Sequence, residues 1–264
     1  NGGLDVTPGA VAAIRTIRLH PSYPTIPDLW IGTEEAGMYF SSDGGANWFA
    51  SNDGLAGTNI RGLAMFHNAS THRLFAGYGD PAWPSPALFR GNAPGPGGPF
   101  SWAPGNNGLR AYQIRALAID PTTTSGGIGT TRIYAAGRAA FPGATPGIRS
   151  GGLYRSVNGG STWHSIDSGL PLANDGQAFL STVRSLVLDP RSCASPPTSG
   201  PCTSGPLQTL YATSTGRSIP PLNDIQFRVL KSIDGGNSWT SADAGIPQPV
   251  SSGPGVQQQL LVVP

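Results

Sequence analysis

The sequence predicts an all-β fold made of repeated four-stranded units, and three observations support this prediction. Short apolar segments rich in β-branched and aromatic residues alternate with turn residues along the whole 264-residue chain. Glycine and proline, at 38 and 26 residues, separate these segments. One motif occurs three times, as SSDGGANW at 41–48, SVNGGSTW at 156–163 and SIDGGNSW at 232–239. No segment has convincing helical periodicity, so the repeats are expected to consist of strands.

Each repeat contains four candidate strands. The first is an apolar segment that often ends in proline: IRTIRLHP (14–21), IRGLAMFH (60–67), IRALAIDP (114–121) and VRSLVLDP (183–190). The second is DLWIGT (28–33), RLFAGY (73–78), RIYAAG (132–137) and TLYATS (209–214). The third leads into the motif, and the fourth starts at the tryptophan of the motif and ends in Gly-Leu or Gly-Ile. The second repeat lacks the motif and keeps only Trp102.

Tandem four-stranded antiparallel units are typical of a β-propeller, in which each unit is a blade. A β-sandwich gives no reason for repeats, and a β-helix needs a shorter and more regular repeat. The blades are expected at 5–55, 56–109, 110–170 and 171–247, with residues 1–4 ending a preceding blade and 248–264 starting a further one. Because propellers usually have more than four blades, the sequence is interpreted as a portion of a larger propeller, with a closed four-bladed ring as the alternative.

The repeated motif is interpreted as a structural turn. Its two glycines allow positive φ, and its serine and aspartate can bond the backbone of the turn. Asn158 replaces the acid in the second copy, a change that a catalytic carboxylate would not readily tolerate. Each tryptophan is expected to wedge between neighbouring strands. The structural set comprises Ser41, Asp43, Gly45, Trp48, Ser156, Asn158, Gly160, Trp163, Ser232, Asp234, Gly236 and Trp239.

The pattern Ser-x-Asp-Gly-Gly-x-x-Trp resembles the Asp-box, or bacterial neuraminidase repeat, of sialidases, two-propeller xyloglucanases, sortilin-type receptors and photosystem II assembly factors. With the LDP and LYATS segments, the resemblance covers essentially the whole chain. It implies a propeller fold and no single function. In those families the box lies on the face away from the active site, which agrees with a structural role here.

The composition narrows the class of protein. A net charge of +2 gives no long-range field to recruit nucleic acid or an anionic membrane, and no apolar run approaches the length of a membrane span. Cys193 and Cys202, nine positions apart, are expected to form a disulfide in an oxidising compartment, with two free thiols or half a zinc site as alternatives. This pair and the scarcity of lysine and glutamate indicate a secreted protein, extracellular or periplasmic.

Long loops are expected on one face of the propeller, after each second strand and between blades. The side chains expected to bind a ligand there are Trp83, Arg138, Phe141 and Arg217. A glycoside hydrolase would need two carboxylates, for which the candidates on this face are Glu34, Asp80, Asp175 and Asp224, although no spacing singles out a pair. The Phe/Tyr-Arg-Ile-Pro signature of sialidases is absent, and Glu34 and Glu35 are the only glutamates.

These observations favour a non-catalytic binding or scaffold module whose partner is a protein or a glycan. The alternatives are a glycoside hydrolase, sialidase-like or xyloglucanase-like, and a structural repeat of a surface layer or filament. The sequence has no motif for a nucleotide or redox cofactor. His67 and His72 flank a turn and carry ring nitrogens that bind metals, but two histidines without a third ligand favour a solvated loop, so no metal site is predicted.

Overall fold

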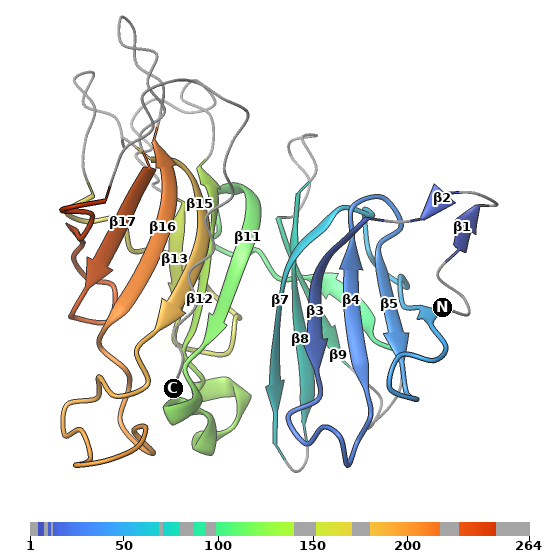
Figure 1. Cartoon of the computed structure of the whole chain (residues 1–264), viewed down its shortest axis with the longest axis horizontal. Coiled ribbons are helices and arrows are strands. Elements are labelled where there is room, and N and C mark those ends of the chain that lie inside the picture. Colours follow the sequence, from blue (N-terminus) through green and yellow to red (C-terminus); the bar gives the residue numbers. More distant parts are fainter. Residues whose placement is uncertain are drawn as a thin grey trace, which may run out of the picture. The chain divides into compact units, whose positions relative to one another are not determined.

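The computed structural model describes residues 5–7, 10–11, 13–68, 71–79, 87–92, 99–139, 152–170, 180–216 and 227–246. The chain divides into two compact units, residues 1–107 and 108–264. Figure 1 shows that nearly every described element is a strand. None of the described helices has the length and apolar character that a membrane crossing requires.

The first unit contains a small hairpin and two four-stranded antiparallel sheets (Figure 1). The hairpin pairs β1 (Asp5–Thr7) with β2 (Ala10–Val11). One sheet has the order β3 (Ile14–Leu19), β4 (Leu29–Thr33), β5 (Met38–Ser41) and β6 (Phe49–Ala50). The other has the order β7 (Ile60–His67), β8 (His72–Tyr78), β9 (Leu88–Asn92) and β10 (Ser101–Pro104). Each four-stranded sheet is a meander, because every strand pairs with its neighbour in sequence.

The second unit contains two further meanders. The first consists of β11 (Ala111–Ile119), β12 (Ile133–Ala139), β13 (Leu153–Ser156) and β14 (His164–Ser165). The second consists of β15 (Leu180–Leu188), β16 (Leu210–Gly216), β17 (Phe227–Ser232) and β18 (Thr240–Ser241). Pairing of Arg138 with Thr182 connects β12 to β15, so that the two meanders form one eight-stranded sheet. Two short 3₁₀ helices, η1 (Pro121–Gly126) and η2 (Ile128–Thr130), follow β11.

The predicted all-β fold is confirmed, because the described chain forms one antiparallel four-stranded meander for each sequence repeat. The β1–β2 hairpin and the two 3₁₀ helices were not expected. Helix η1 starts at Pro121, and Oδ1 of Asp120 accepts a hydrogen bond from the Thr122 amide at 3.1 Å, which caps it. Residues 1–4 and 248–264 lie outside the described residues, and the expected blade boundaries stay predictions.

Apolar side chains fill the space between neighbouring meanders within each unit. The core of the first unit draws on both of its meanders and includes Trp30, Phe40, Ile60, Leu74, Phe89, Phe100 and Trp102. The core of the second unit includes Tyr134, Leu153, Ile166, Val183, Leu210, Leu230 and Trp239. Burial of these side chains is what makes one meander pack on the next, since a single four-stranded sheet would leave them in water.

The three copies of the motif, here called the box turns, form the same hydrogen bonds. In the first, Oγ of Ser41 donates to Asp43 at 2.8 Å and accepts from the Gly45 amide at 2.9 Å. Both carboxylate oxygens of Asp43 then bond Asn47, one to its amide and one to its side chain. Box turns 156–163 and 232–239 repeat this arrangement around Asn158 and Asp234. The side chains of each box turn therefore satisfy one another's hydrogen bonds within the turn, and their structural role stays a prediction.

Two tryptophans connect their meander to the preceding one, and the expectation that each tryptophan wedges between neighbouring strands stays a prediction. The indole nitrogen of Trp239 donates to the carbonyl of Ile166 at 2.7 Å, across the two meanders of the second unit. Trp102, in the repeat without the motif, donates in the same way to the carbonyl of Ser51 at 2.7 Å. Trp48 instead donates to Gly45 within its own turn. The indoles of Trp102 and Trp239 thus each bond a carbonyl of the preceding meander.

Replacing Asp43 with alanine is expected to lower the melting temperature by a few degrees, because the turn loses all its carboxylate bonds. Hydrogen bonds from the amide and side chain of Asn47, and then from Ser41, hold the pKa of Asp43 at about 2, below its usual 3.8. Because this pKa is depressed by folding, the carboxylate contributes stability above pH 3.8 that is lost as the pH falls through 2.

The control for this prediction is Asp43→Asn, which copies Asn158 of the second box turn. At neutral pH this variant should have a melting temperature close to that of the wild type. Because an amide does not titrate, the loss of stability that protonation of Asp43 causes at low pH should be absent. Thermal unfolding followed by circular dichroism between pH 2 and pH 7 measures both effects. An alanine variant as stable as the wild type at neutral pH would contradict the structural role of the box turn.

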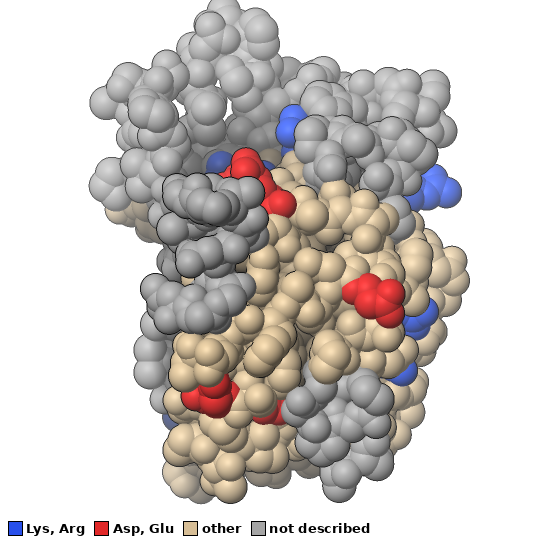
Figure 2. Space-filling model, turned by 90° about the vertical axis from the view of Figure 1, so that its right-hand side faces the viewer, with Lys and Arg blue, Asp and Glu red and all other residues tan. Residues whose placement is uncertain are grey.

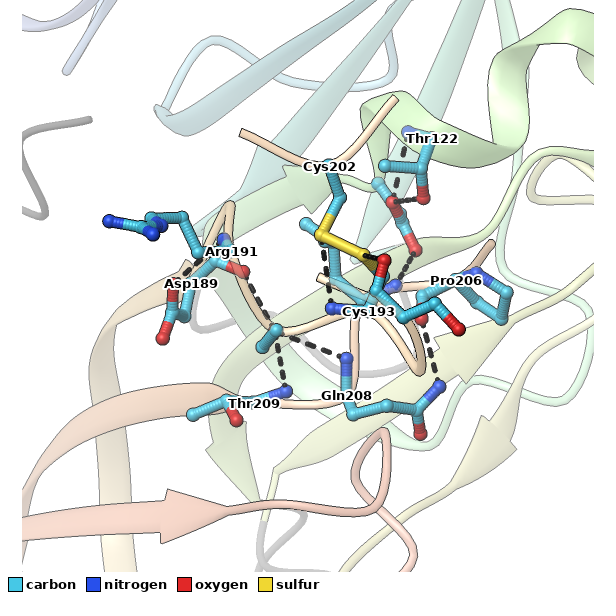
Figure 3. Close-up of a disulfide and its surroundings, with 12 residues drawn as sticks. Thr122, Asp189, Arg191, Cys193, Cys202, Pro206, Gln208 and Thr209 are labelled. Carbon is cyan, nitrogen blue, oxygen red and sulfur yellow. Dashed lines mark hydrogen bonds between the residues drawn. A yellow bond between two sulfur atoms is a disulfide. The ribbon is translucent and has the colours of Figure 1, made fainter. Parts of the chain in front are cut away.

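The predicted Cys193–Cys202 disulfide is present in the loop between β15 and β16 (Figure 3). The Cys193 amide donates to Sγ of Cys202 at 3.2 Å, and both residues are buried against Leu207. The Leu207 amide donates to Oδ2 of Asp120 at 2.9 Å, which binds this loop to the end of the neighbouring β11. Asp189 accepts from the Arg191 amide, so the aspartates of IDP and LDP both cap turns, as expected.

Candidate binding face

Two of the eight side chains expected on the loop face, Glu34 and Arg138, lie in the described part of the chain. Arg138 is half-buried near the end of β12, at the point where β12 meets Thr182 of β15. The other six fall outside the described residues: Asp80, Trp83, Phe141, Asp175, Arg217 and Asp224. Their contribution to a binding face therefore stays a prediction.

The first strand of every meander has a β-bulge near its pairing with the end of the second strand. A bulge inserts one extra residue in a strand opposite its partner strand. The strand bends there, and the side chain of the extra residue points in a different direction from that in a regular strand. In β3 the extra residue is Arg15, between the paired residues Ile14 and Thr16. In β7, β11 and β15 the extra residues at the equivalent positions are Arg61, Arg115 and Arg184. We call these four side chains the bulge arginines.

Two bulge arginines of the first unit share one carboxylate. Arg15 and Arg61 both form ion pairs with Glu34, Arg15 through Nη2 to Oε2 and Arg61 through Nη2 to Oε1 at 2.9 Å. The hydrogen bond from Arg15, followed by the charge of Arg61, lowers the pKa of Glu34 against the raising effect of desolvation. Nε of Arg61 is buried and has no hydrogen-bond partner among the described residues. This carboxylate is therefore held between the first strands of two adjacent meanders.

The part of the surface that Figure 2 draws carries little charge. Figure 2 shows the side of the molecule that lies on the right in Figure 1, with acidic and basic residues in small separate groups on a mostly uncharged surface. Charged residues make up 11% of the sequence. The charge that this surface offers to a ligand is thus local and not a broad field of one sign.

The bulge arginines of the second unit have no glutamate between them. Nε and Nη2 of Arg115 donate to the side-chain oxygen of Gln113 at 3.1 and 2.7 Å. Nε of Arg184 is buried without a hydrogen-bond partner among the described residues. Opposite the Arg184 bulge stand the buried residues Thr213 and Ser214, whose hydroxyl oxygens also have no partner in the described part. Polar groups that can bind an anion are therefore concentrated at this bulge.

The two units differ in charge at one equivalent position. Glu34 follows Thr33, which pairs with Ile14 just before the first bulge. Arg138 follows Gly137, which pairs with Ile114 just before the third bulge. The second unit consequently has a third guanidinium, Arg138, where the first unit has the carboxylate that neutralises its bulge arginines.

This arrangement has the chemistry of a carboxylate-binding site. A guanidinium presents donors in a planar fork that matches two carboxylate oxygens, and Glu34 displays how two bulge arginines hold one such group. The sequence analysis selected Arg138 and missed the bulge arginines. Their signal was the Ile-Arg or Val-Arg pair that opens the first apolar segment of each repeat in the sequence, at 14–15, 60–61, 114–115 and 183–184. Periodicity alone does not reveal a bulge, so this arginine would be read as an ordinary outward-facing residue.

Comparisons with known proteins show the fold. No family model matches the chain, and no curated protein matches it. The chain is similar to the solved structure of the GH74 xyloglucanase from Xanthomonas campestris, with a TM-score of 0.52 and 20% identity over 83% of this chain and 29% of that one. It is similar to a GH74 enzyme from Niastella koreensis, with a TM-score of 0.53 and 20% identity over 87% of this chain and 30% of that one.

A further similarity is to a structure of YCF48 bound to D1 peptide, with a TM-score of 0.44 and 15% identity over 92% of this chain and 58% of that one. The chain spans less than a third of the length of the two GH74 enzymes. The described chain forms four consecutive antiparallel meanders, and it is similar to the two GH74 structures. The chain has the fold of a β-propeller.

Proposed function

We propose that this chain is a non-catalytic binding module that holds a carboxylate-bearing ligand, protein or glycan, at the end of the blades where the bulge arginines lie. The observation that carries the proposal is the replacement of a carboxylate by a guanidinium at equivalent positions, Glu34 in the first unit and Arg138 in the second. In the first unit a carboxylate of the chain itself lies between two bulge arginines. In the second unit, a carboxylate of the ligand takes that place.

The segments that carry the predicted loop residues follow strands that end at the same end of the blades. Because strands in a meander are antiparallel, the loop after each second strand emerges where the first strand begins. The segments that carry Trp83, Phe141 and Arg217 follow β8, β12 and β16, and the bulge arginines pair near the ends of these strands. Aromatic side chains and guanidinium groups together suit recognition of an acidic peptide or an acidic sugar.

The proposal includes the Asp-box assignment and export from the cytoplasm. The hydrogen bonds of the box turns support the assignment of the motif as an Asp-box, since the side chains bond each other within the turn. The Cys193–Cys202 disulfide supports an oxidising compartment, extracellular or periplasmic.

Replacing Arg115, Arg138 and Arg184 together with glutamine is expected to weaken binding of an acidic ligand by about 100-fold or more, since each charged hydrogen bond contributes about 1.5–3 kcal/mol. The probes are oligoglutamate and polygalacturonate, with oligoglutamine and xyloglucan as uncharged counterparts. Titration calorimetry at two salt concentrations measures affinity. Arg191→Gln is the matched control, because this exposed arginine lies in the loop after β15, at the opposite end of the strand.

Two outcomes would contradict the proposal. One is an affinity for both acidic probes that is the same in the triple variant and the wild type. The other is turnover of a sialoside or a β-glucan that disappears when Asp80, Asp175 or Asp224 is replaced by asparagine in a folded protein, which would make the chain part of a glycoside hydrolase.

A further inference from the structure

Three of the four histidines of the chain meet at one point in the first unit. His20 follows the last residue of β3, whereas His67 ends β7 and His72 begins β8. The last two are paired in register across the turn between their strands. One ring nitrogen from each histidine lies within 4.8 Å of the others. The ring centroids of His20 and His67 are 4.4 Å apart, and those of His67 and His72 are 4.5 Å apart.

The turn is therefore not the solvated loop that the sequence suggested. His20 is 2% exposed, and His67 and His72 are half-buried. Nδ1 of His67 lies 2.9 Å from Nδ1 of His72, so the two nitrogens can satisfy one another only if one of them carries a proton. The cluster is packed on one side and reachable from solvent on the other, which leaves a path for a small ion.

Two buried polar atoms beside the cluster have no partner. Nε2 of His20 is buried and makes no hydrogen bond to the described residues, and the same holds for Oδ2 of Asp28. Asp28 is 3% exposed, and its charge interacts with both His20 and His72. A buried carboxylate oxygen and a buried ring nitrogen left without partners are costly in a folded protein. A cation held by the three rings would satisfy the nitrogen directly and the carboxylate by its charge.

We propose that His20, His67 and His72 form a binding site for a transition-metal dication of the zinc type, with Asp28 as the buried counter-charge. Neutral imidazole is a preferred ligand of Zn²⁺, Ni²⁺ and Cu²⁺, whereas Mg²⁺ and Ca²⁺ prefer oxygen. Three histidine ligands leave a fourth position of a tetrahedral site for water or another ligand. Asp28 acts through charge and through the orientation of the rings, as carboxylates beside metal-bound histidines commonly do.

Metal binding requires a small rearrangement of the rings. Zinc–nitrogen bonds of about 2.0–2.1 Å put the nitrogens of a tetrahedral site about 3.4 Å apart. The Nδ1 atoms of His67 and His72 must separate from 2.9 Å, and the nitrogen of His20, which lies within 4.8 Å of the other two ligand nitrogens, must reach the same spacing. The Ser22 amide now donates to Nδ1 of His20 at 3.0 Å. Coordination through Nε2 moves the ring proton to Nδ1, so this one backbone bond is exchanged for the metal bond.

The site would link two blades. His20 belongs to the meander of β3, and His67 and His72 belong to the meander of β7, so a bound metal connects the ends of neighbouring sheets. Metal bound to the folded chain and not to the unfolded chain raises the stability of the first unit.

The experiment uses chelator-treated protein without a polyhistidine tag, titrated with Zn²⁺ by calorimetry and with Co²⁺ by visible absorption, which is intense for a tetrahedral site. We expect one Zn²⁺ per chain, a higher melting temperature with Zn²⁺, and neither effect with Mg²⁺. His67→Ala and His72→Ala should each weaken Zn²⁺ binding by about 100-fold or more. His164→Ala is the matched control, because His164 is the fourth histidine and is exposed on β14; it should bind as the wild type does.

Asp28→Asn gives a second, separate measurement. It should reduce Zn²⁺ affinity by about 10–100-fold and keep one metal per chain, since it removes the counter-charge and no ligand. His20→Asn tests the buried ligand. If this variant does not fold, His67→Ala and His72→Ala still test the site, because these two residues are only half-buried. Absence of Zn²⁺ binding at micromolar metal in the folded wild type, or binding that is unchanged in the His67→Ala, His72→Ala double variant, would overturn the proposal.

Discussion

Trp239→Ala is expected to lower the free energy of unfolding of the second unit by about 3–5 kcal/mol, the usual cost of removing a large buried aromatic side chain. Trp239 is 2% exposed and belongs to the core that both meanders of this unit share. Its indole nitrogen donates to the carbonyl of Ile166 in the other meander. The substitution thus leaves a cavity and also an unpaired carbonyl between two meanders.

Two further variants separate these contributions. Trp239→Phe keeps an aromatic ring and removes the hydrogen bond, so about 1–3 kcal/mol should be lost from the unpaired carbonyl, in addition to a smaller packing loss. Ile233→Ala, at a residue that is 68% exposed in the same box turn, should cost less than about 0.5 kcal/mol. Urea unfolding followed by far-ultraviolet circular dichroism measures all three. Equal stability of Trp239→Ala and Ile233→Ala would show that the indole does not hold the meanders together.

Gly54→Ala is expected to lower the free energy of unfolding of the first unit by about 3–5 kcal/mol, for two reasons that add. Gly54 has a φ of +81°, a conformation that side chains rarely adopt. A Cβ atom at this position would also lie 2.1 Å from the carbonyl oxygen of Trp102, in the neighbouring meander. Backbone cannot move aside as a flexible side chain can, so the two sheets would have to separate.

Gly245→Ala is the matched control for this clash. Gly245 closes the last repeat as Gly54 closes the first, and its φ of +82° is nearly the same, but no described atom lies within 4 Å of an added Cβ. This variant should lose only the conformational part, about 1–2 kcal/mol. The difference between the two variants, measured by urea unfolding, reports the contact between meanders. A loss for Gly54→Ala no greater than that for Gly245→Ala would contradict the close approach.

Local chemistry explains why the sequence predicted much of the fold. The box turns are complete within eight residues, because Ser41, Asp43 and Gly45 bond one another. The disulfide joins cysteines nine positions apart in one loop, and Asp120 and Asp189 cap turns that begin at the next residue. Strands alternate with these turns in every repeat, so the number of strands in each repeat could be predicted from the sequence.

The candidate sites depend on contacts between residues that are far apart in the sequence. The bulges that present Arg15 and Arg61 arise from the pairing of two strands, and one glutamate joins these arginines only because two meanders pack together. His20 lies 47 residues before His67 in the sequence, and the histidine cluster exists only where β3 ends beside β7 and β8. Trp102 and Trp239 likewise reach carbonyls of the preceding meander, not of their own.

The sequence by itself therefore determined the all-β class, the four-stranded repeat, the box turns and the disulfide, since each follows from residues close together in the chain. The tertiary structure alone decided which side chains from different sheets meet: the bulge arginines with Glu34, the third histidine with the other two, and the indoles with the neighbouring meander. The physical reason is that turn geometry is set by local hydrogen bonds, whereas contacts between sheets are set by packing of buried apolar side chains.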